Sequence, residues 1–342
     1  MFRHHSTSLR YSMVVAAVLL LSLLGAAPLI ASDTQFSGRA TVVNATVLGV
    51  NTVLADTGSL DSSGGQKEAS LLNETVPGLL TAEVFHASTV GQGNQSRAEA
   101  SVANLELTLP GNNTIGADFL MAKAEAKCTN GSASVSGSSE IAALMINGNT
   151  IVVSGQPNQT IELGSLKVVI NEQTGTPPSD ITVNALHVTV KDPLSGATLA
   201  DVIVSSAHAD ITCGRPPCES SRDFVTGGGW IDPLSNGSKA NFAVAGGIKN
   251  GFWGHLQYID HGTGMKVKGT GVTAYTIVDS VTRHIEGTCE INGVVGSYFA
   301  DVADITEPGR GADTFRLRLS NGYDTGVLKL SGGNIQLHFP CQ

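Results

Sequence analysis

Alternation of apolar and polar residues is the feature that most limits what this chain can fold into. In "FRLRLS", Phe315, Leu317 and Leu319 alternate with Arg316 and Arg318, and "NIQLHF" repeats the pattern. Successive side chains of a β-strand point to opposite faces of a sheet, so this period of two separates a buried face from a solvated one. The second half of the chain is therefore predicted to form an antiparallel sheet with one wet face.

The first half carries the same signal in a less obvious form. The stretch "ADFLMAKAEAKC", residues 117–128, is rich in helix-forming residues. However, Lys123, Glu125 and Lys127 alternate with alanines, which a strand would sort onto opposite faces and a helix would scatter. We predict a strand whose inner face is made of small residues.

Strand-like runs separated by Gly, Asn, Asp and Pro clusters predict an all-β protein with two β-sandwich-like domains. The boundary falls in "CGRPPCESSR", where Pro216 and Pro217 block ladder hydrogen bonds. The expected domains are residues 33–213 and a Gly-rich domain at residues 223–342, with a linker at residues 214–222.

The N-terminal 31 residues have the pattern of a signal peptide. Arg3 and Arg10 precede an apolar run at residues 13–24, and small residues around Ala31 suit cleavage. This run is shorter than the roughly 20 residues that span a bilayer, and the rest of the chain offers no such run. The mature protein is expected to be secreted, extracellular or periplasmic, with no membrane span.

Charge argues against nucleic acid as a partner. Charged residues make up 14% of the 342 residues, and the formal net charge is −9. Binding to a phosphate backbone needs clustered lysines and arginines, which this chain lacks.

The five cysteines all follow Ala31, where an oxidising compartment permits disulfides. Cys128 and Cys213 each end a strand-like run, so we expect them to pair. Closing that loop would contribute roughly 4 kcal/mol in the chain-entropy model. The partners of the remaining three are left open: Cys218, Cys289 and Cys341.

Several motifs of the first half occur in order: "ADTGSL" with "SGG" just after it, "AEAKC", "GSSEIAALMINGN" and "SSAHADITCG". Through them the first domain resembles the choice-of-anchor P family of exported bacterial modules. The second domain is similar to the module that commonly follows choice-of-anchor domains, through "TGGGWI", "GHLQYIDHGTGMKVKGTGVTAY", "DITEPGRGADTFRLRLSNGY" and "SGGNIQLHF". The resemblance implies an extracytoplasmic β-rich protein and transfers no catalytic residue, although no anchor follows the final strand.

The glycines of "FVTGGGWIDP" raise the possibility of a phosphate-binding loop. Such a loop needs a following Gly-Lys-Ser/Thr or a helix, and neither follows Trp230. We interpret Gly227, Gly228 and Gly229 as residues that let a neighbouring strand approach, with Trp230 as a packing anchor.

The second domain offers two further candidate sites. Acidic residues near position 307 offer the oxygen ligands that calcium prefers, without the spacing of an EF-hand. A small ligand-binding platform, for a carbohydrate, would combine aromatic and acid/base residues of the second domain. The candidate calcium ligands are Asp301, Asp304, Glu307 and Asp313, and the candidate ligand-binding residues are Trp253, Tyr258, Asp260 and His261.

No motif for nucleophilic catalysis or for a cofactor occurs in the chain. We therefore expect an exported structural or interaction module without catalytic activity, whose partner is an extracellular or cell-surface polymer or protein. The alternative is a carbohydrate-binding or hydrolytic accessory protein acting through the second domain.

Overall fold

The computed structural model describes residues 33–214, 223–249 and 251–338. Residues 33–342 group into one compact unit. The predicted signal peptide with its cleavage site at Ala31, most of the predicted linker, Cys218 and Cys341 lie outside the described residues. Within them the chain is all-β, as predicted, and every paired strand is antiparallel.

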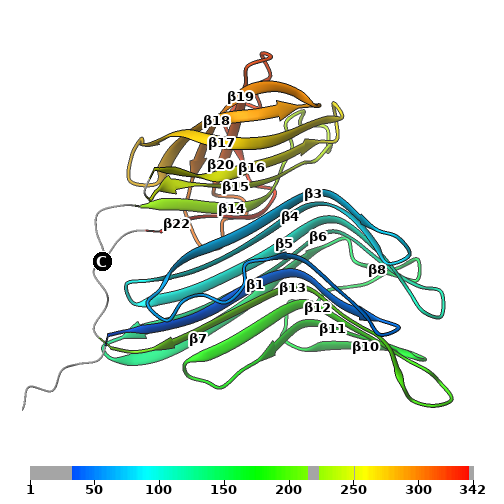
Figure 1. The fold of residues 1–342 in the computed structure, drawn as a ribbon. Helices are drawn as coiled ribbons and strands as arrows, with labels where there is room; N and C mark the ends of the chain where they lie inside the picture. The colour runs from blue at the N-terminus through cyan, green and yellow to red at the C-terminus, as the bar shows by residue number, and fades with distance from the viewer. Residues whose placement is uncertain (1–32, 215–222, 250, 339–342) are drawn as a thin grey trace, which may run out of the picture. The chain divides into compact units, whose positions relative to one another are not determined.

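The described residues form three sheets (Figure 1). The first sheet has the order β10 (Gln159–Leu163), β11 (Leu166–Thr174), β12 (Asp180–Lys191), β13 (Thr198–Thr212), β1 (Gln35–Val47) and β2 (Val50–Asp56). The second sheet has the order β3 (Gly65–Val76), β4 (Leu80–Gln92), β5 (Gln95–Leu109), β6 (Asn113–Thr129), β8 (Met145–Ile146) and β9 (Asn149–Thr150), and β7 (Ser132–Ala142) also pairs with β6.

The third sheet contains nine strands and curls into a half-barrel. Its order is β21 (Leu328–Lys329), β20 (Thr314–Leu319), β19 (Val294–Ala303), β18 (Thr282–Ile291), β17 (Met265–Ile277), β16 (Phe252–Asp260), β15 (Ala240–Ile248), β14 (Phe224–Ile231) and β22 (Gly332–His338). In chain order β14 is the first strand of this sheet and β22 is the last, and these two strands pair with each other. In the same way, β1 and β13 are the first and last strands of the first sheet along the chain, and they also pair.

The first and second sheets pack face to face around one hydrophobic core. Strand β6 shows why: Ala122, Ala124 and Ala126 are buried, while Lys123 and Glu125 on the opposite face are half-buried. The prediction of a small-residue inner face is confirmed. Alanine side chains are short, so facing layers can approach closely.

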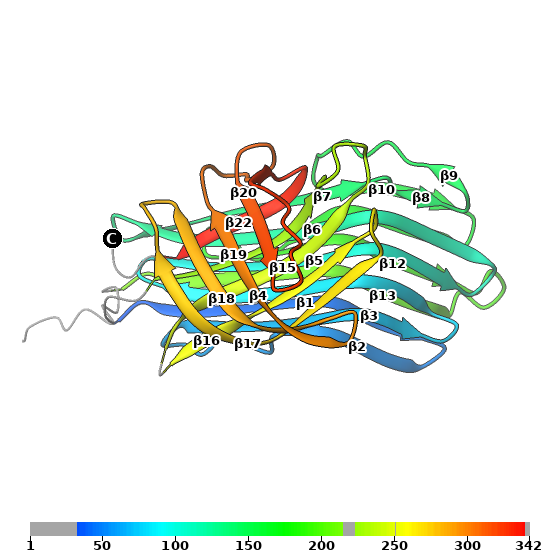
Figure 2. The ribbon, with the colours of Figure 1, turned by 90° about the horizontal axis from the view of Figure 1, so that it is seen from above.

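The third sheet covers part of the outer face of the second sheet, and its strands cross that sheet obliquely (Figure 2). As a result, β4 and β5 are buried on both faces over several residues, and every residue of β14 is buried. A separate hydrophobic cluster joins the two sheets; its members are Val84, Ala103, Phe119, Met121, Trp230, Ala243 and Ile259.

The strands of the first and second sheets bend partway along their length (Figure 1). Partway along these strands, Asn73 on β3 and Asn104 on β5 have φ values of 54° and 49°, and Asn171 and Ser205 hold the same left-handed conformation in the first sheet. Asparagine tolerates this region better than most residues because its short side chain hydrogen-bonds locally. Asn104 donates to Glu83 at 2.8 Å, so the bend also places polar groups toward the third sheet.

The glycines of "TGGGWI" allow close packing on both faces of β14. A Cβ on Gly228 would lie 2.9 Å from Ser101 Oγ of the second sheet, and one on Gly229 would lie 2.3 Å from the carbonyl oxygen of Gly332 on β22. Trp230 is buried against Phe119 of β6, with ring centroids 5.1 Å apart. The predicted close approach and packing role are therefore confirmed, although the ring packs onto the second sheet.

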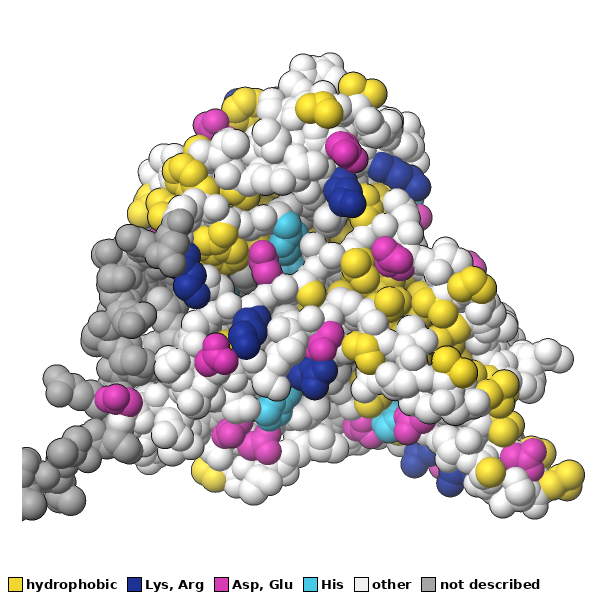
Figure 3. Space-filling model, in the orientation of Figure 1, with side chains coloured by type: hydrophobic (Ala, Val, Ile, Leu, Met, Phe, Trp, Pro, Cys, Tyr) yellow, Lys and Arg dark blue, Asp and Glu magenta, His cyan; other side chains and the backbone are white. Residues whose placement is uncertain are grey.

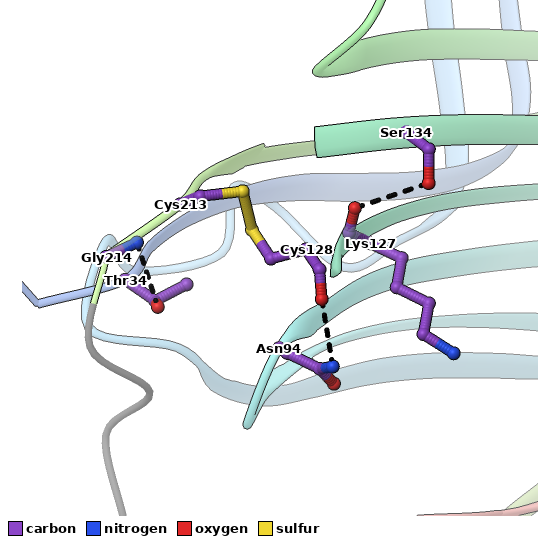
Figure 4. The surroundings of a disulfide bond; sticks show 7 residues. All are labelled: Thr34, Asn94, Lys127, Cys128, Ser134, Cys213 and Gly214. Carbon is purple, nitrogen blue, oxygen red and sulfur yellow. Dashed lines mark hydrogen bonds between the residues drawn. A yellow bond between two sulfur atoms is a disulfide. The ribbon is translucent and has the colours of Figure 1, made fainter. Parts of the chain in front are cut away.

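Cys128 and Cys213 form a disulfide between the end of β6 and the residue after β13, as predicted (Figure 4). It joins the second sheet to the first across 85 residues of sequence. Asn94 donates to the carbonyl oxygen of Cys128 at 3.0 Å beside it. Cys289 is a buried free thiol, and burial raises its pKa.

Candidate functional site

Two adjoining cavities lie where the outer face of β5, β6 and β7 meets β22 and the segment before β20. One has a volume of about 280 Å³ and the other about 380 Å³. Arg97, Glu307 and Gln336 line both, so the two cavities form one open depression, which we call the junction groove. The first cavity is also lined by Gln92, Asn94, Gln95, Asp304 and His338, and the second by Glu99, Lys123, Glu125, Ser136 and Ser138.

The strands explain why these side chains meet. Arg97 and Glu99 are two residues apart on β5 and therefore point to the same face. Their cross-strand partners on β6 are Glu125 and Lys123. The alternation that buries alanines on one face thus places two pairs of opposite charges on the other face, directly under Glu307.

Most fixed charges of the groove are paired. Lys123 Nζ lies 2.9 Å from Glu307 Oε2, and Arg97 Nη2 lies 3.5 Å from Glu125 Oε1. The other carboxylate oxygen of Glu307 accepts a hydrogen bond from Gln336 at 2.9 Å. However, Arg97 Nε is buried and has no hydrogen-bond partner among the described residues.

Glu99 differs from the other carboxylates of the groove. Its side chain is 8% exposed, and burial raises its pKa to about 7, against the opposing effect of Lys123. Within the described part of the chain it forms no hydrogen bond. Burial likewise raises the pKa of Asp304 to about 6, although Asp304 accepts a hydrogen bond from the backbone of Leu337 at 2.8 Å. Perturbed acids in a cleft are typical of functional sites, although buried structural acids show the same behaviour.

Three of the four candidate calcium ligands lie near one another. Asp304 and Glu307 line the groove, and both interact electrostatically with Asp313. Asp313 is fully buried and accepts backbone hydrogen bonds from Ile305, Thr306 and Ile335. Its oxygens thus hold the segment before β20 against β22.

Asp301, the fourth candidate, is engaged elsewhere. It lies on β19, 2.5 Å from His284 Nδ1 and 3.6 Å from Arg318 Nη2. No group of three or more His, Cys, Asp or Glu side chains suited to a metal ion occurs within residues 33–214, 223–249 and 251–338.

The four candidate ligand-binding residues of the third sheet are not brought together as a platform. Tyr258 is fully buried, and its hydroxyl lies 2.6 Å from that of Tyr323, which donates to Asp260 at 2.8 Å. Asp260 is also fully buried and accepts from the backbone of Gly262. Trp253 is half-buried against Phe224.

His261 contacts the second sheet. Its Nε2 lies 3.0 Å from Glu83 Oε2 and 3.1 Å from Asn104 Nδ2, at the bend of that sheet. The hydrogen bond to Glu83 raises the pKa of His261. Three further ion pairs also join an acidic side chain of the second sheet to a basic side chain from the second half of the chain. They are Glu68 with His255, Asp118 with Lys239, and Glu140 with Arg310.

A second group of titratable side chains is enclosed between the second and third sheets. His86 is 1% exposed, and its ring lies 5.6 Å from that of His255. Both ring nitrogens of His86 and Nε2 of His255 lack a hydrogen-bond partner among the described residues. Burial lowers the pKa of His86 to about 3, so this ring is neutral at physiological pH.

The face seen in Figure 3 carries basic and acidic side chains scattered singly or in small groups, without a continuous patch of either sign. This agrees with the ion pairs given above. None of the described residues belongs to a helix long and apolar enough to cross a membrane.

Arg97, Glu99, Lys123 and Gln336 were not predicted as site residues. The alternation in "RAEAS" and "AKAEAK" marks the face on which three of them lie, but a solvated sheet face has the same pattern. No local signal indicates that Glu307 and Gln336, about 200 positions later, cover that face.

The fold and the groove define an all-β protein of stacked antiparallel sheets with a polar depression at a junction between sheets. No family model, no curated protein and no solved structure matches the chain. The Cys128–Cys213 disulfide fits an extracellular or periplasmic protein.

Proposed function

We propose that this protein is an exported interaction module without catalytic activity, and that it binds its partner in the junction groove. The observation that carries the proposal is an open depression of polar side chains in which the Glu99 carboxyl group forms no hydrogen bond with the described residues and Arg97 is only partly paired. A partner that hydrogen-bonds to the Glu99 carboxyl group would gain about 1 kcal/mol of binding free energy from that bond.

The disulfide supports export, and the choice-of-anchor resemblance adds a proposed family for the first domain. The partner is then a polymer or protein at or outside the cell surface. Signal peptide cleavage near Ala31 belongs to the same proposal, and N-terminal sequencing of the exported protein tests it. A mature chain that begins far from Ser32 would contradict it.

Binding at the groove, rather than at Trp253 and its neighbours, is supported by the contacts within the fold. Tyr258 and Asp260 already hydrogen-bond within the third sheet, and His261 bonds to the second sheet. In contrast, the groove residues Ser136 and Ser138 are exposed on β7.

A pair of variants on β7 tests the proposal. Ser138→Leu places a bulky side chain in the groove, whereas Ser134→Leu makes the same change at an exposed position of the same strand outside it. Fluorescently labelled protein is applied to the extracellular matrix of the producing cells, and bound and released material are measured. We expect Ser138→Leu to lose binding and Ser134→Leu to keep it.

Two results would contradict the proposal. Equal binding by both variants would place the partner elsewhere. Progressive release of soluble matrix fragments by the unmodified protein would indicate catalysis.

A further inference from the structure

The chemistry of the groove limits what its ligand can be. Its two basic residues, Arg97 and Lys123, each face a carboxylate within 3.5 Å. Burial raises the pKa of Glu99 and Asp304, so these acids carry less charge near neutral pH than solvated acids do. A strongly anionic ligand would therefore meet no uncompensated positive charge.

The lining presents many hydrogen-bonding groups instead. Amides come from Gln92, Asn94, Gln95 and Gln336, and hydroxyls come from Ser136 and Ser138. Amides offer both donors and acceptors, and a hydroxyl does both with one oxygen. Such a surface matches a ligand with many hydroxyl groups, because each ligand hydroxyl also donates and accepts.

Two charged residues of the groove define a distance between contact points for a ligand. Arg97 and Glu99 lie on one face of β5, two residues and about 6.6 Å apart along the strand. The first is a donor and the second is either a donor or an acceptor, depending on its protonation. Successive hydroxyls along an extended ligand can reach both Arg97 and Glu99. The two joined cavities provide room for such an extended ligand.

We propose that the junction groove binds a segment of a neutral, hydroxyl-rich saccharide, with one hydroxyl accepting from the exposed part of the Arg97 guanidinium and another hydrogen-bonded to Glu99. This inference rests on the proposed function, because it names the chemical class of the partner that the groove binds. In this proposal the saccharide is recognised by planar polar groups, namely guanidinium, amide and carboxyl groups, rather than by aromatic rings.

Calorimetric titration of the full chain with defined oligosaccharides tests this assignment. The neutral probes are cellotetraose, maltotetraose and N-acetylchitotetraose, and the acidic probe is tetragalacturonate. We expect at least one neutral probe to bind and the acidic probe to bind more weakly, because the groove carboxylates repel it. Ser138→Leu should abolish that binding, and Ser134→Leu should leave it unchanged.

Arg97→Lys is the sharper variant, because it keeps a positive charge opposite Glu125 but removes the planar fork of guanidinium donors. We expect about tenfold weaker binding of the neutral probe, as when a site loses one hydrogen bond to a substrate hydroxyl. Unchanged affinity in Arg97→Lys, with an unchanged unfolding midpoint, would overturn the assignment of Arg97.

The saccharide proposal and the proposed function can fail separately. If no saccharide binds while Ser138→Leu still abolishes matrix binding, the groove binds a partner of another class and the saccharide proposal is overturned. If the acidic probe binds more tightly than every neutral one, the saccharide is not neutral and the proposal is again overturned. If matrix binding also ignores Ser138→Leu, both proposals fail.

Discussion

Glu99 and Lys123 lie directly opposite each other on β5 and β6, yet they do not form a hydrogen-bonded ion pair. Lys123 Nζ instead contacts Glu307 at 2.9 Å, from the segment that precedes β20. The ammonium group of Lys123, which could neutralise Glu99, thus pairs with Glu307, 184 positions later in the chain than Lys123. Glu99 remains buried, with a pKa of about 7.

This arrangement predicts that Glu99→Gln stabilises the protein at alkaline pH. A carboxyl whose folded-state pKa is raised stabilises the fold at low pH, and this contribution is lost as pH rises from about 4.5 to about 7. The variant does not ionise, so its advantage over the unmodified chain should grow by up to about 3 kcal/mol between pH 4 and pH 8. Urea unfolding at the two pH values measures it.

Glu106→Gln is the matched control, because Glu106 lies on the same strand and is exposed. The control should change the unfolding free energy by less than about 0.5 kcal/mol at either pH. If Glu99→Gln and Glu106→Gln behave alike, Glu99 ionises normally in the fold.

The lowered pKa of buried His86 predicts that the protein loses stability in acid. Its pKa is lowered to about 3 in the folded chain, so the unfolded chain takes up one more proton as pH falls below about 6.5. Stability from the neutral ring is therefore present above pH 6.5 and is lost toward pH 3. His86→Leu should reduce the slope of unfolding free energy between pH 4 and pH 6 by about 1.4 kcal/mol per pH unit.

The control is His208→Leu, since His208 on β13 is half-buried and its Nε2 lies 3.1 Å from Asp180 Oδ1. The slopes of the two variants are compared with that of the unmodified chain. His86→Leu should also be tolerated near pH 7, because both ring nitrogens lack partners and an apolar group of similar size leaves none unsatisfied. An unaltered acid slope would mean that His86 is protonated within the fold.

Chelation of divalent metal is predicted to leave thermal stability unchanged. The oxygens of Asp313 already accept three backbone N–H groups, and Glu307 is bonded to Lys123 and to side-chain amides. These donors use the oxygen lone pairs that calcium would need. Thermal unfolding with EDTA and with millimolar calcium should give the same midpoint, and a midpoint lowered by EDTA would restore calcium as a ligand.

The strands were predictable from local pattern, whereas the arrangement of the sheets was not. Alternation in "FRLRLS" corresponds to β20, where Phe315, Leu317 and Leu319 are buried and both arginines are half-buried. An alternation of period two is recognised from neighbouring residues alone, so predicting these strands requires no knowledge of distant residues. The Cys128–Cys213 pair was also predictable, because each cysteine ends a strand.

The second sheet shows why the rest was not predictable. The polar face of β6 is read from sequence as solvated, but Lys123 there contacts Glu307 and Asp118 contacts Lys239. Which face a third sheet covers depends on residues more than 100 positions away. Asparagines within strand-like runs, such as "VANLEL" around Asn104, are a local sign of the bends, because asparagine tolerates left-handed backbone.

Removing the disulfide should lower the unfolding free energy by up to about 4.6 kcal/mol, according to the chain-entropy model for a loop of 85 residues. The variant is Cys128→Ala combined with Cys213→Ala, compared by urea unfolding with the oxidised protein. Reductant should destabilise the unmodified chain and leave the double variant unchanged. Equal stability of all three would show that the bond does not contribute.

Trp230→Ala is predicted to weaken the packing of the third sheet on the second. The ring is 8% exposed and contacts Phe119 of β6, and the Lys239 ammonium lies 5.4 Å from its centroid. Large-to-small changes at buried aromatic positions cost about 3 to 5 kcal/mol, so we expect about 3 kcal/mol in urea unfolding. Trp253→Ala is the matched control, because that ring is half-buried within the third sheet and its loss should cost about 1 kcal/mol.

Hydrogen exchange distinguishes a local effect on the contact between the second and third sheets from general destabilisation. Amides of β14 and of the facing part of β6 should exchange faster in Trp230→Ala, while those of β12 keep their protection. Equal acceleration across all three sheets would contradict a role of Trp230 at this junction.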